Sequence, residues 1–307
     1  MPTTSDQKFA ITADTLKNGD FQVVARAISL VENSNSGAED LLKSIQHKHV
    51  PVIGITGPPG AGKSTLVDAL IKQFTNDGKK LAVLCVDPSS SFHSGAILGD
   101  RIRMNRWYNN PGVFIRSLAS RGDVGGLNPR IFQITDLLAN AGFDYILIET
   151  VGVGQTEIEI TRLADQVVLV LVPESGDDIQ TMKSGIMEIG DIFVVNKSDR
   201  PGAEQFLTSL KSSIHYQTAK PMNEIHFIQT IATEEKGIPE LYSVIKENIH
   251  RLSPHRSLNQ LTQKAWELIS IYRMQDLNKE DLLHSLEKAA ADPDFNIYRF
   301  AESISGK

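Results

Sequence analysis

The feature that most constrains the fold of this 307-residue chain is the stretch GITGPPGAGKSTLVDAL at residues 54–70. It holds the pattern G-x-x-x-x-G-K-S/T between a β-branched run, VIGIT, and a run with helical spacing, the context that a phosphate-binding loop requires. Glycines allow torsions that turn successive N–H groups inward, and a helix N-terminus adds its positive dipole end. A plain Gly-Pro turn would need neither the lysine nor the serine. The stretch therefore predicts a loop for the phosphates of a nucleoside triphosphate.

Two side chains of this loop have separate predicted tasks. The Lys63 ammonium should reach the β- and γ-phosphates, and the Ser64 hydroxyl should ligate Mg²⁺. The residues expected to contact the phosphates are Gly57, Pro58, Pro59, Gly60, Ala61, Gly62, Lys63, Ser64 and Thr65.

Seven short apolar runs after residue 50 predict the strands of a sheet. Most are separated by segments of helical length, and their continuous apolarity suits strands covered on both faces. This predicts an α/β fold, a doubly wound and mainly parallel sheet whose ligands gather at the carboxyl ends of the strands. The runs are PVIGIT (51–56), LAVLCV (81–86), VFIR (113–116), DYILIE (144–149), QVVLVLV (166–172), IFVVN (192–196) and IHFIQ (225–229).

Helical patterns flank this predicted sheet on both sides. One apolar stripe runs from Val23 to Val31 and another from Leu41 to Ile45, with the breaker stretch NSNSGAED between them. Near the C-terminus, KAWELISIYRM and EDLLHSLEKAAA predict two helices separated by QDLNKE, with Asn278 or Asp281 near a helix start. We expect an N-terminal helical extension at 1–49, a phosphate-loop domain at 50–252 and a C-terminal helical arm at 253–307.

Composition excludes several classes of protein. Lys and Arg total 31 against 37 Asp and Glu, a net charge of -6, so no basic field attracts nucleic acid. The one cysteine, Cys85, lies in an apolar run and is expected to be a buried hydrophobic residue. No signal sequence or membrane-length apolar run is present, so we expect a cytoplasmic protein without a membrane partner.

Two carboxylates follow predicted strands and are candidates for Mg²⁺. LAVLCV is followed by Asp87, and DYILIE ends in Glu149. Oxygen ligands beside Ser64 suit this hard cation, bound directly or through water. Asp87 also precedes a proline, so its alternative is a turn-initiating residue. The cation is the stronger interpretation for Glu149, because a carboxylate at the end of a buried strand is costly unless a cation or donors meet it. Glu149 is also a candidate catalytic residue, with Lys63.

The run IFVVN ends in the element Asn196-Lys197-Ser198-Asp199, which predicts the choice of base. The Asp199 carboxylate can accept from N1–H and the 2-amino group of guanine, a donor pair that adenine lacks. After IHFIQ, backbone N–H groups of Ile231 and Ala232 are candidates for contact with guanine O6. GTP is therefore favoured over ATP.

Several long motifs resemble the MeaB/ArgK family of GTPases, in the SIMIBI class of phosphate-loop NTPases. They are residues 57–65, VDPSSSFHSGAILGDRIRM, RSLASRGDVGGL, ETVGVGQTEIEI and GDDIQTMKSGIMEIGDIFVVNKSD. The resemblance covers about residues 20–241. It implies a GTP hydrolase that binds GTP, GDP and Mg²⁺ and associates with an adenosylcobalamin-dependent acyl-CoA mutase such as methylmalonyl-CoA mutase. Such a protein gates delivery of the cobalamin cofactor and protects the mutase.

The same resemblance suggests which segments change with the nucleotide. Asp87 and Asp100 correspond to switch I, Glu149 replaces the more familiar Asp of the third GTPase motif, and residues 176–185 resemble the family's switch III. The candidate switch and partner residues are Asp100, Arg121, Gln155, Asp177, Asp178 and Lys183.

Three positions depart from the family pattern, and other assignments stay open. Asp123 replaces a His, Glu174 replaces a Gly, and Ile231 replaces a Ser. Arg116 and Arg121 fit phosphate or partner contact as well as they fit a solvated loop. The C-terminal arm is shorter than in relatives that dimerise through it, so homodimerisation stays open.

The expected reaction is in-line attack of water on the γ-phosphate, with charge stabilised by Lys63, Mg²⁺ and the loop amides. Gln155 has no clear role in orienting that water, so slow hydrolysis stimulated by the mutase is predicted. One alternative is a kinase of a protein or small molecule, which also uses a phosphate loop and Mg²⁺. Another is a nucleotide-gated binding protein in which hydrolysis is incidental.

Overall fold

The computed structural model describes residues 11–87, 104–119, 127–150, 156–175, 188, 190–217, 224–250, 254–274, 277–292 and 294–304. The chain divides into two compact units, Met1–Arg256 and Ser257–Lys307. The first contains the sheet and the helices of the predicted N-terminal extension, and the second contains most of the predicted arm. The three-part division of the sequence stays a prediction.

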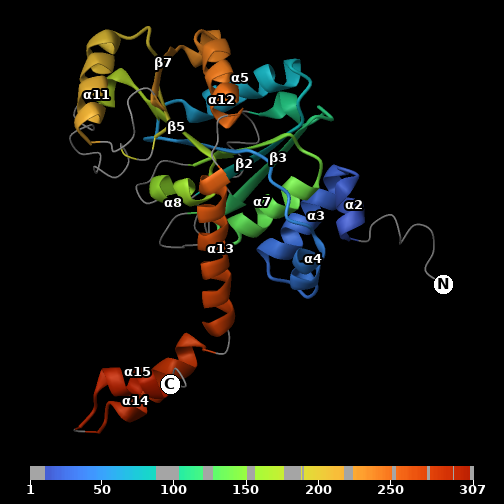
Figure 1. The fold of residues 1–307 in the computed structure, drawn as a ribbon, viewed down its shortest axis with the longest axis vertical. Helices are drawn as coiled ribbons and strands as arrows, with labels where there is room; N and C mark the ends of the chain where they lie inside the picture. The colour runs from blue at the N-terminus through green and yellow to red at the C-terminus, as the bar shows by residue number, and fades with distance from the viewer. Residues whose placement is uncertain are drawn as a thin grey trace, which may run out of the picture. The chain divides into compact units, whose positions relative to one another are not determined.

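The first unit is built on one sheet whose seven described strands are all parallel (Figure 1). Its strand order is β3-β2-β4-β1-β5-β6-β7, so β1 is central and its two neighbours come later in the chain. All seven predicted runs form strands, and the doubly wound fold is confirmed. The strands are β1 (Val52–Thr56), β2 (Leu81–Asp87), β3 (Val113–Ala119), β4 (Tyr145–Glu149), β5 (Gln166–Leu171), β6 (Ile192–Asn196) and β7 (His226–Thr230).

Strand alternation divides the core into two layers. Leu81, Val83 and Cys85 pack on one face of the sheet, whereas Ala82 and Leu84 pack on the other. Cys85 is buried, as predicted. The first face is covered by α5 (Lys63–Asn76) and α12 (Ile238–His250). The second is covered by α3 (Phe21–Glu32), α7 (Ile131–Asn140), α8 (Thr156–Leu163) and α11 (Ala203–Gln217).

In the part of the chain that the structure describes, three connections around the sheet contain a short 3₁₀ helix with defined bounds. These helices are η1 (Asn105–Trp107), η2 (Pro173–Ser175) and η4 (Ala232–Glu234). η2 follows β5 and η4 follows β7, so both lie near the carboxyl ends of strands, where the sequence predicts the nucleotide site.

The N-terminal helices pack against the sheet layer. The stripe predicted from Val23 to Val31 is the buried face of α3, and Leu41 is buried on α4 (Ala38–Ser44). The spacing of apolar residues did not indicate the short helix α2 (Ala13–Lys17). A capping box stabilises its N-terminus: the Thr12 side chain accepts from the Thr15 N–H, and the Thr15 side chain accepts from the Thr12 N–H. Arg116 on β3 contacts α3: its guanidinium is 3.1 Å from Ser29 Oγ and 3.3 Å from Glu32 Oε2. This favours a role in fastening α3 to the sheet.

The C-terminal helices are α13 (Pro254–Met274), α14 (Lys279–Ala289) and α15 (Ile297–Ile304). The first two agree with the predicted helices, and Asn278 caps α14 by accepting from the Glu280 N–H at 2.9 Å. Helix α15 was not predicted. None of the helices in the described part of the chain is long and apolar enough to cross a bilayer.

A buried carboxylate fastens the start of β1, and a histidine contacts it. Asp165 accepts from the Val52 N–H at 2.8 Å, and its other oxygen is 3.1 Å from His49 Nε2. The hydrogen bond to Asp165 raises the pKa of His49 above its usual 6.5. Protonation of His49 is therefore linked to folding.

We predict that His49 stabilises the fold at acidic pH and does so less at alkaline pH. Because the folded pKa is raised, the contribution is complete below about pH 6.5 and is lost as pH rises through the folded pKa. Urea unfolding of the wild type and His49→Gln at several pH values checks this. The difference in unfolding free energy between the two proteins should shrink with rising pH, and a constant difference would contradict the linkage.

Candidate nucleotide-binding site

The loop between β1 and α5 has the backbone conformation that its glycines suggest. Gly57, Gly60 and Gly62 have φ of 139°, 77° and 89°, which disfavour other residues. A Cβ on Gly57 would lie 2.1 Å from the Val170 carbonyl oxygen. Helix α5 begins at Lys63, immediately after the loop, as predicted.

The Lys63 ammonium lies inside the loop. It donates to the carbonyl oxygens of Gly57 at 2.8 Å and Pro58 at 2.9 Å, and the residue is only 6% exposed. A buried positive charge therefore stands beside the N-terminus of α5, where an anion is favoured.

Ser64 and Glu149 meet although 85 residues separate them. The Ser64 hydroxyl donates to Glu149 Oε1 at 2.6 Å. Strand alternation explains the contact: Glu149 shares the side of β4 that carries Tyr145 and Leu147, the side that α5 covers. The next residue, Thr150, donates to the Thr56 hydroxyl at 2.8 Å and fastens the end of β4 to β1.

A hydroxyl and a carboxylate are the hard oxygen donors that Mg²⁺ prefers. Within the described part of the chain, no group of three or more His, Cys, Asp or Glu is arranged to hold a metal ion. The two oxygens of this pair fit Mg²⁺, because that ion usually keeps several waters and takes few protein ligands. Asp87 ends β2 at the same edge of the sheet, paired with Ala119 of β3.

The predicted base-binding residues surround a cavity of about 190 Å³. The end of the phosphate loop, the loop after β6 and the loop after β7 contribute to it. The residues that line it are Gly62, Thr65, Asn196, Lys197, Asp199, Arg200, Ile231, Ala232 and Thr233. Sequence reasoning missed Arg200, which adjoins the predicted Asp199.

Asn196 joins the three loops of this cavity. Its Nδ2 donates to the Ala61 carbonyl at 2.9 Å, and its Oδ1 accepts from the Thr230 hydroxyl at 3.0 Å and the Ala232 N–H at 3.1 Å. Lys197 adds a further contact to the phosphate loop, through its ammonium and the Gly60 carbonyl at 2.8 Å.

The two backbone N–H groups predicted to contact guanine O6 donate to different protein acceptors in this structure. The Ile231 N–H donates to the Lys236 carbonyl at 3.1 Å and closes its own loop. The Ala232 N–H donates to Asn196 Oδ1, also at 3.1 Å. Both N–H groups therefore have protein acceptors in this structure, and their contact with a base stays a prediction.

A second departure from the family pattern, besides Ile231, has a described contact. Glu174, in η2, forms an ion pair with Arg200 of the cavity, and this hydrogen bond lowers the pKa of the Glu174 carboxyl. The contact links the end of β5 to the loop after β6. Six predicted switch and partner residues and one departure lie outside the described residues: Asp100, Arg121, Gln155, Asp177, Asp178, Lys183 and Asp123.

Comparison with known proteins identifies the family. The family model described as "Methylmalonyl Co-A mutase-associated GTPase MeaB" matches residues 24–290. The chain belongs to the MeaB family of GTPases. As a member of this family it is a GTP hydrolase that binds guanine nucleotides, and the resemblance inferred from the motifs is confirmed.

Individual similar proteins are consistent with the assignment of this chain to the MeaB family. A provisionally named GTPase of Pyrococcus horikoshii is 48% identical over 241 residues, 76% of this chain and 76% of that protein. A protein named fused isobutyryl-CoA mutase, from Geobacillus kaustophilus, is 35% identical over 255 residues, 78% of this chain but only 23% of that protein. The crystal structure of an LAO/AO transport system kinase has a TM-score of 0.67 at 23% identity, covering 99% of both chains, and shows the same fold.

We predict that Gly62→Ala weakens GTP binding by roughly tenfold or more. An added Cβ would lie 2.4 Å from Asn196 Nδ2, and displacing a buried, hydrogen-bonded amide costs about 1–3 kcal/mol. Gly78→Ala is the matched control, because Gly78 also has a positive φ, 71°, but no atom within 4 Å. Titration with a fluorescent GTP analogue measures both, and equal losses in the two variants would assign the effect to backbone strain.

We predict that Asp199→Asn exchanges the preferred base. The variant should lose roughly 10- to 100-fold in GTP affinity, since hydrogen bonds to a charged group are worth about 1.5–3 kcal/mol. It should gain affinity for xanthosine triphosphate, whose O2 can accept from the new amide. Competition between the two nucleotides checks the exchange, and unchanged GTP affinity would remove Asp199 from base recognition.

Proposed function

We propose that this MeaB-family GTPase depends on Mg²⁺ and acts as a chaperone for an adenosylcobalamin-dependent acyl-CoA mutase. Its nucleotide state gates delivery of the cobalamin cofactor to the mutase and protects the loaded enzyme. Methylmalonyl-CoA mutase or a related acyl-CoA mutase is the partner.

The observation that carries the proposal is the match to the fused isobutyryl-CoA mutase. In that protein a segment resembling this chain belongs to the same polypeptide as a mutase. Covalent linkage supplies a high effective concentration of one module beside the other, which is useful when the two act together. The name of the family model, a mutase-associated GTPase, supports the same partner class.

The geometry supports a reaction that depends on positioning and electrostatics. The Lys63 ammonium lies inside the phosphate loop, and from there it would neutralise charge that develops on the γ-phosphate. The amides at the start of α5 act on the same oxygens. Water attacks the γ-phosphate in line, and no side-chain nucleophile is required.

Mg²⁺ would be held by Ser64 Oγ, with Glu149 and Asp87 as direct or water-mediated ligands. When bound, it neutralises charge on the β- and γ-phosphate oxygens. Glu149 already orients the Ser64 hydroxyl, at 2.6 Å. The protein's own contribution at this point is therefore a prepared pair of oxygen donors beside the phosphate loop.

Selection of GTP over ATP rests on the cavity after β6. Asp199 would provide a carboxylate for N1–H and the 2-amino group of guanine, and the loop that holds Ala232 lines the same cavity. A base without the matching donors would leave this carboxylate unpaired, which makes discrimination strong.

We predict slow, GTP-selective hydrolysis that rises when the mutase is added. The assay uses purified protein with Mg²⁺, with GTP or ATP, and with or without methylmalonyl-CoA mutase or isobutyryl-CoA mutase. Lys63→Ala should abolish turnover, whereas Lys43→Ala, which removes an exposed lysine from α4, should not.

The outcomes of this assay separate the parts of the proposal. Stimulation by one mutase supports the chaperone function and names the partner class. Turnover indifferent to both mutases would contradict the partner, and a preference for ATP would contradict the base assignment.

A further inference from the structure

The loop between β7 and α12 is a tight, self-closed turn. The Ile231 N–H donates to the Lys236 carbonyl at 3.1 Å, and the Lys236 N–H donates back to the Ile231 carbonyl at 3.3 Å. η4 lies between them, and Ile231, Ala232 and Thr233 line the base cavity. We call residues 231–236 the base loop.

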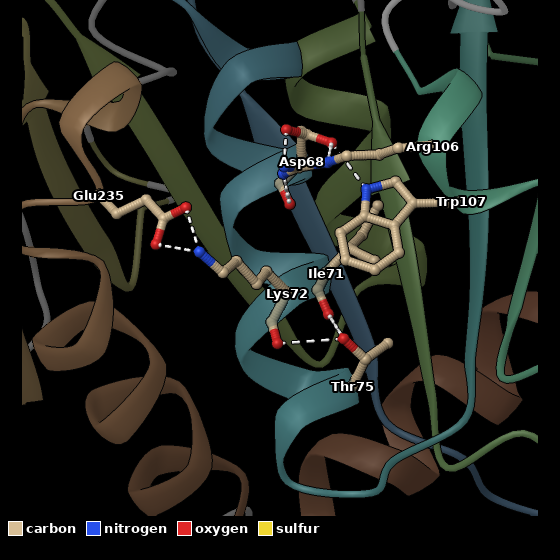
Figure 2. Close-up of polar contacts among 7 residues, drawn as sticks. All are labelled: Asp68, Ile71, Lys72, Thr75, Arg106, Trp107 and Glu235. Carbon is tan, nitrogen blue, oxygen red and sulfur yellow. Dashed lines mark hydrogen bonds and ion pairs between the residues drawn. The ribbon is translucent and has the colours of Figure 1, made fainter. Parts of the chain in front are cut away.

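Glu235 has an unusual backbone conformation in the base loop. Its φ is 57°, in the left-handed region, where a residue with a Cβ is strained and glycine is not. Its side chain makes a contact that glycine could not make: Oε1 and Oε2 lie 2.6 and 2.7 Å from Lys72 Nζ. Figure 2 shows this two-oxygen contact between the base loop and α5.

Lys72 stands on the helix that begins at the phosphate loop. Helix α5 starts at Lys63, so Lys72 lies on the same rigid element as the residues predicted to bind the phosphates. At the cavity itself, Asn196 joins the phosphate loop to Ala232 of the base loop. The base loop is thus fastened at two places, once at Ala232 and once at Glu235.

We infer that Lys72 and Glu235 are positioning residues for guanine recognition. Their ion pair sets the distance between the base loop and α5, so that the part of the base loop that lines the cavity faces guanine O6 while the phosphates occupy the phosphate loop. This inference rests on the proposed base site. It adds a residue on α5, Lys72, that affects the affinity for the base and lies outside the N-K-S-D element.

A neighbouring ion pair on α5 contacts η1 and does not contact the base loop. One turn before Lys72, Asp68 accepts from the Trp107 indole N–H at 2.7 Å and from Arg106 Nε at 2.9 Å. Figure 2 shows these contacts directed to η1, away from the base loop. Among the described ion pairs of α5, Lys72 with Glu235 is therefore the one that reaches the base loop.

The exposure of the pair limits the size of its effect. The Lys72 and Glu235 side chains are 41% and 38% exposed, and half-exposed pairs are worth up to about 1 kcal/mol, or roughly fivefold in affinity. Such a pair contributes little to global stability, so its removal should change nucleotide affinity without unfolding the protein.

The test measures affinity for GTP and for 2-aminopurine riboside triphosphate, which keeps the 2-amino group and lacks both O6 and the N1–H. The variants are Glu235→Gln, Lys72→Met and the double variant. The control is Lys246→Met, which removes a comparable lysine–carboxylate pair with Asp77 at the far end of α5. A further variant, Glu235→Gly, removes the carboxylate and also relieves the backbone strain.

We expect each single variant to lose about three- to fivefold in GTP affinity, with the 2-aminopurine nucleotide unchanged. The double variant should be no weaker than either single variant. Glu235→Gly should melt no lower than the wild type and still bind GTP more weakly.

Three results would overturn the inference: unchanged GTP affinity, equal losses for both nucleotides, or an equal loss in Lys246→Met. Failure of the proposed base site gives a different result, in which the wild type binds the two nucleotides equally and Asp199→Asn has no effect. That result would overturn the inference as well.

Discussion

The buried amide of Asn196 is the contact on which the geometry of the nucleotide site depends. It is 2% exposed, and both ends of its side chain are hydrogen-bonded, to Ala61 on one side and to Thr230 and Ala232 on the other. An unsatisfied amide here would carry a large desolvation cost, so the three loops are held at one spacing. Gly62 matches this constraint, since any side chain at that position would occupy the place of the amide.

The parallel sheet brings these loops to a common edge. Because β1 is central, its carboxyl end lies beside those of β4 and β5, and the loop after it is flanked by functional groups from both sides. Alternation along β4 then directs Glu149 toward α5, where Ser64 meets it. The phosphate side and the base side of the site thus follow from one topology. Helix α5 connects them, since it begins at Lys63 and contacts the base loop through Lys72.

The charge of the whole molecule contributes little to this site. A net charge of -6 does not attract a nucleotide, so binding depends on local donors: the Lys63 ammonium, the loop amides and the N-terminus of α5. Short-range, oriented donors also discriminate between bases, which a diffuse field cannot do. Arg116, expected to fit phosphate or partner contact or a solvated loop, instead contacts Glu32 of α3.

The sequence by itself determined the strands, the phosphate loop, the position of α5 and the residues at the base cavity, because each depends on local pattern. β-branched runs, glycine spacing and the N-K-S-D element all lie within a few residues of the structure that they specify. It did not indicate α15, the position of Arg200 at the cavity, or the commitment of the Ile231 N–H to Lys236. Only the tertiary structure decided these, together with the pair Lys72–Glu235 and the direct hydrogen bond between Ser64 and Glu149, two residues that the sequence predicted to lie at one site. The members of these two pairs are 163 and 85 residues apart, and strand order and the placement of α5 bring them within hydrogen-bonding distance.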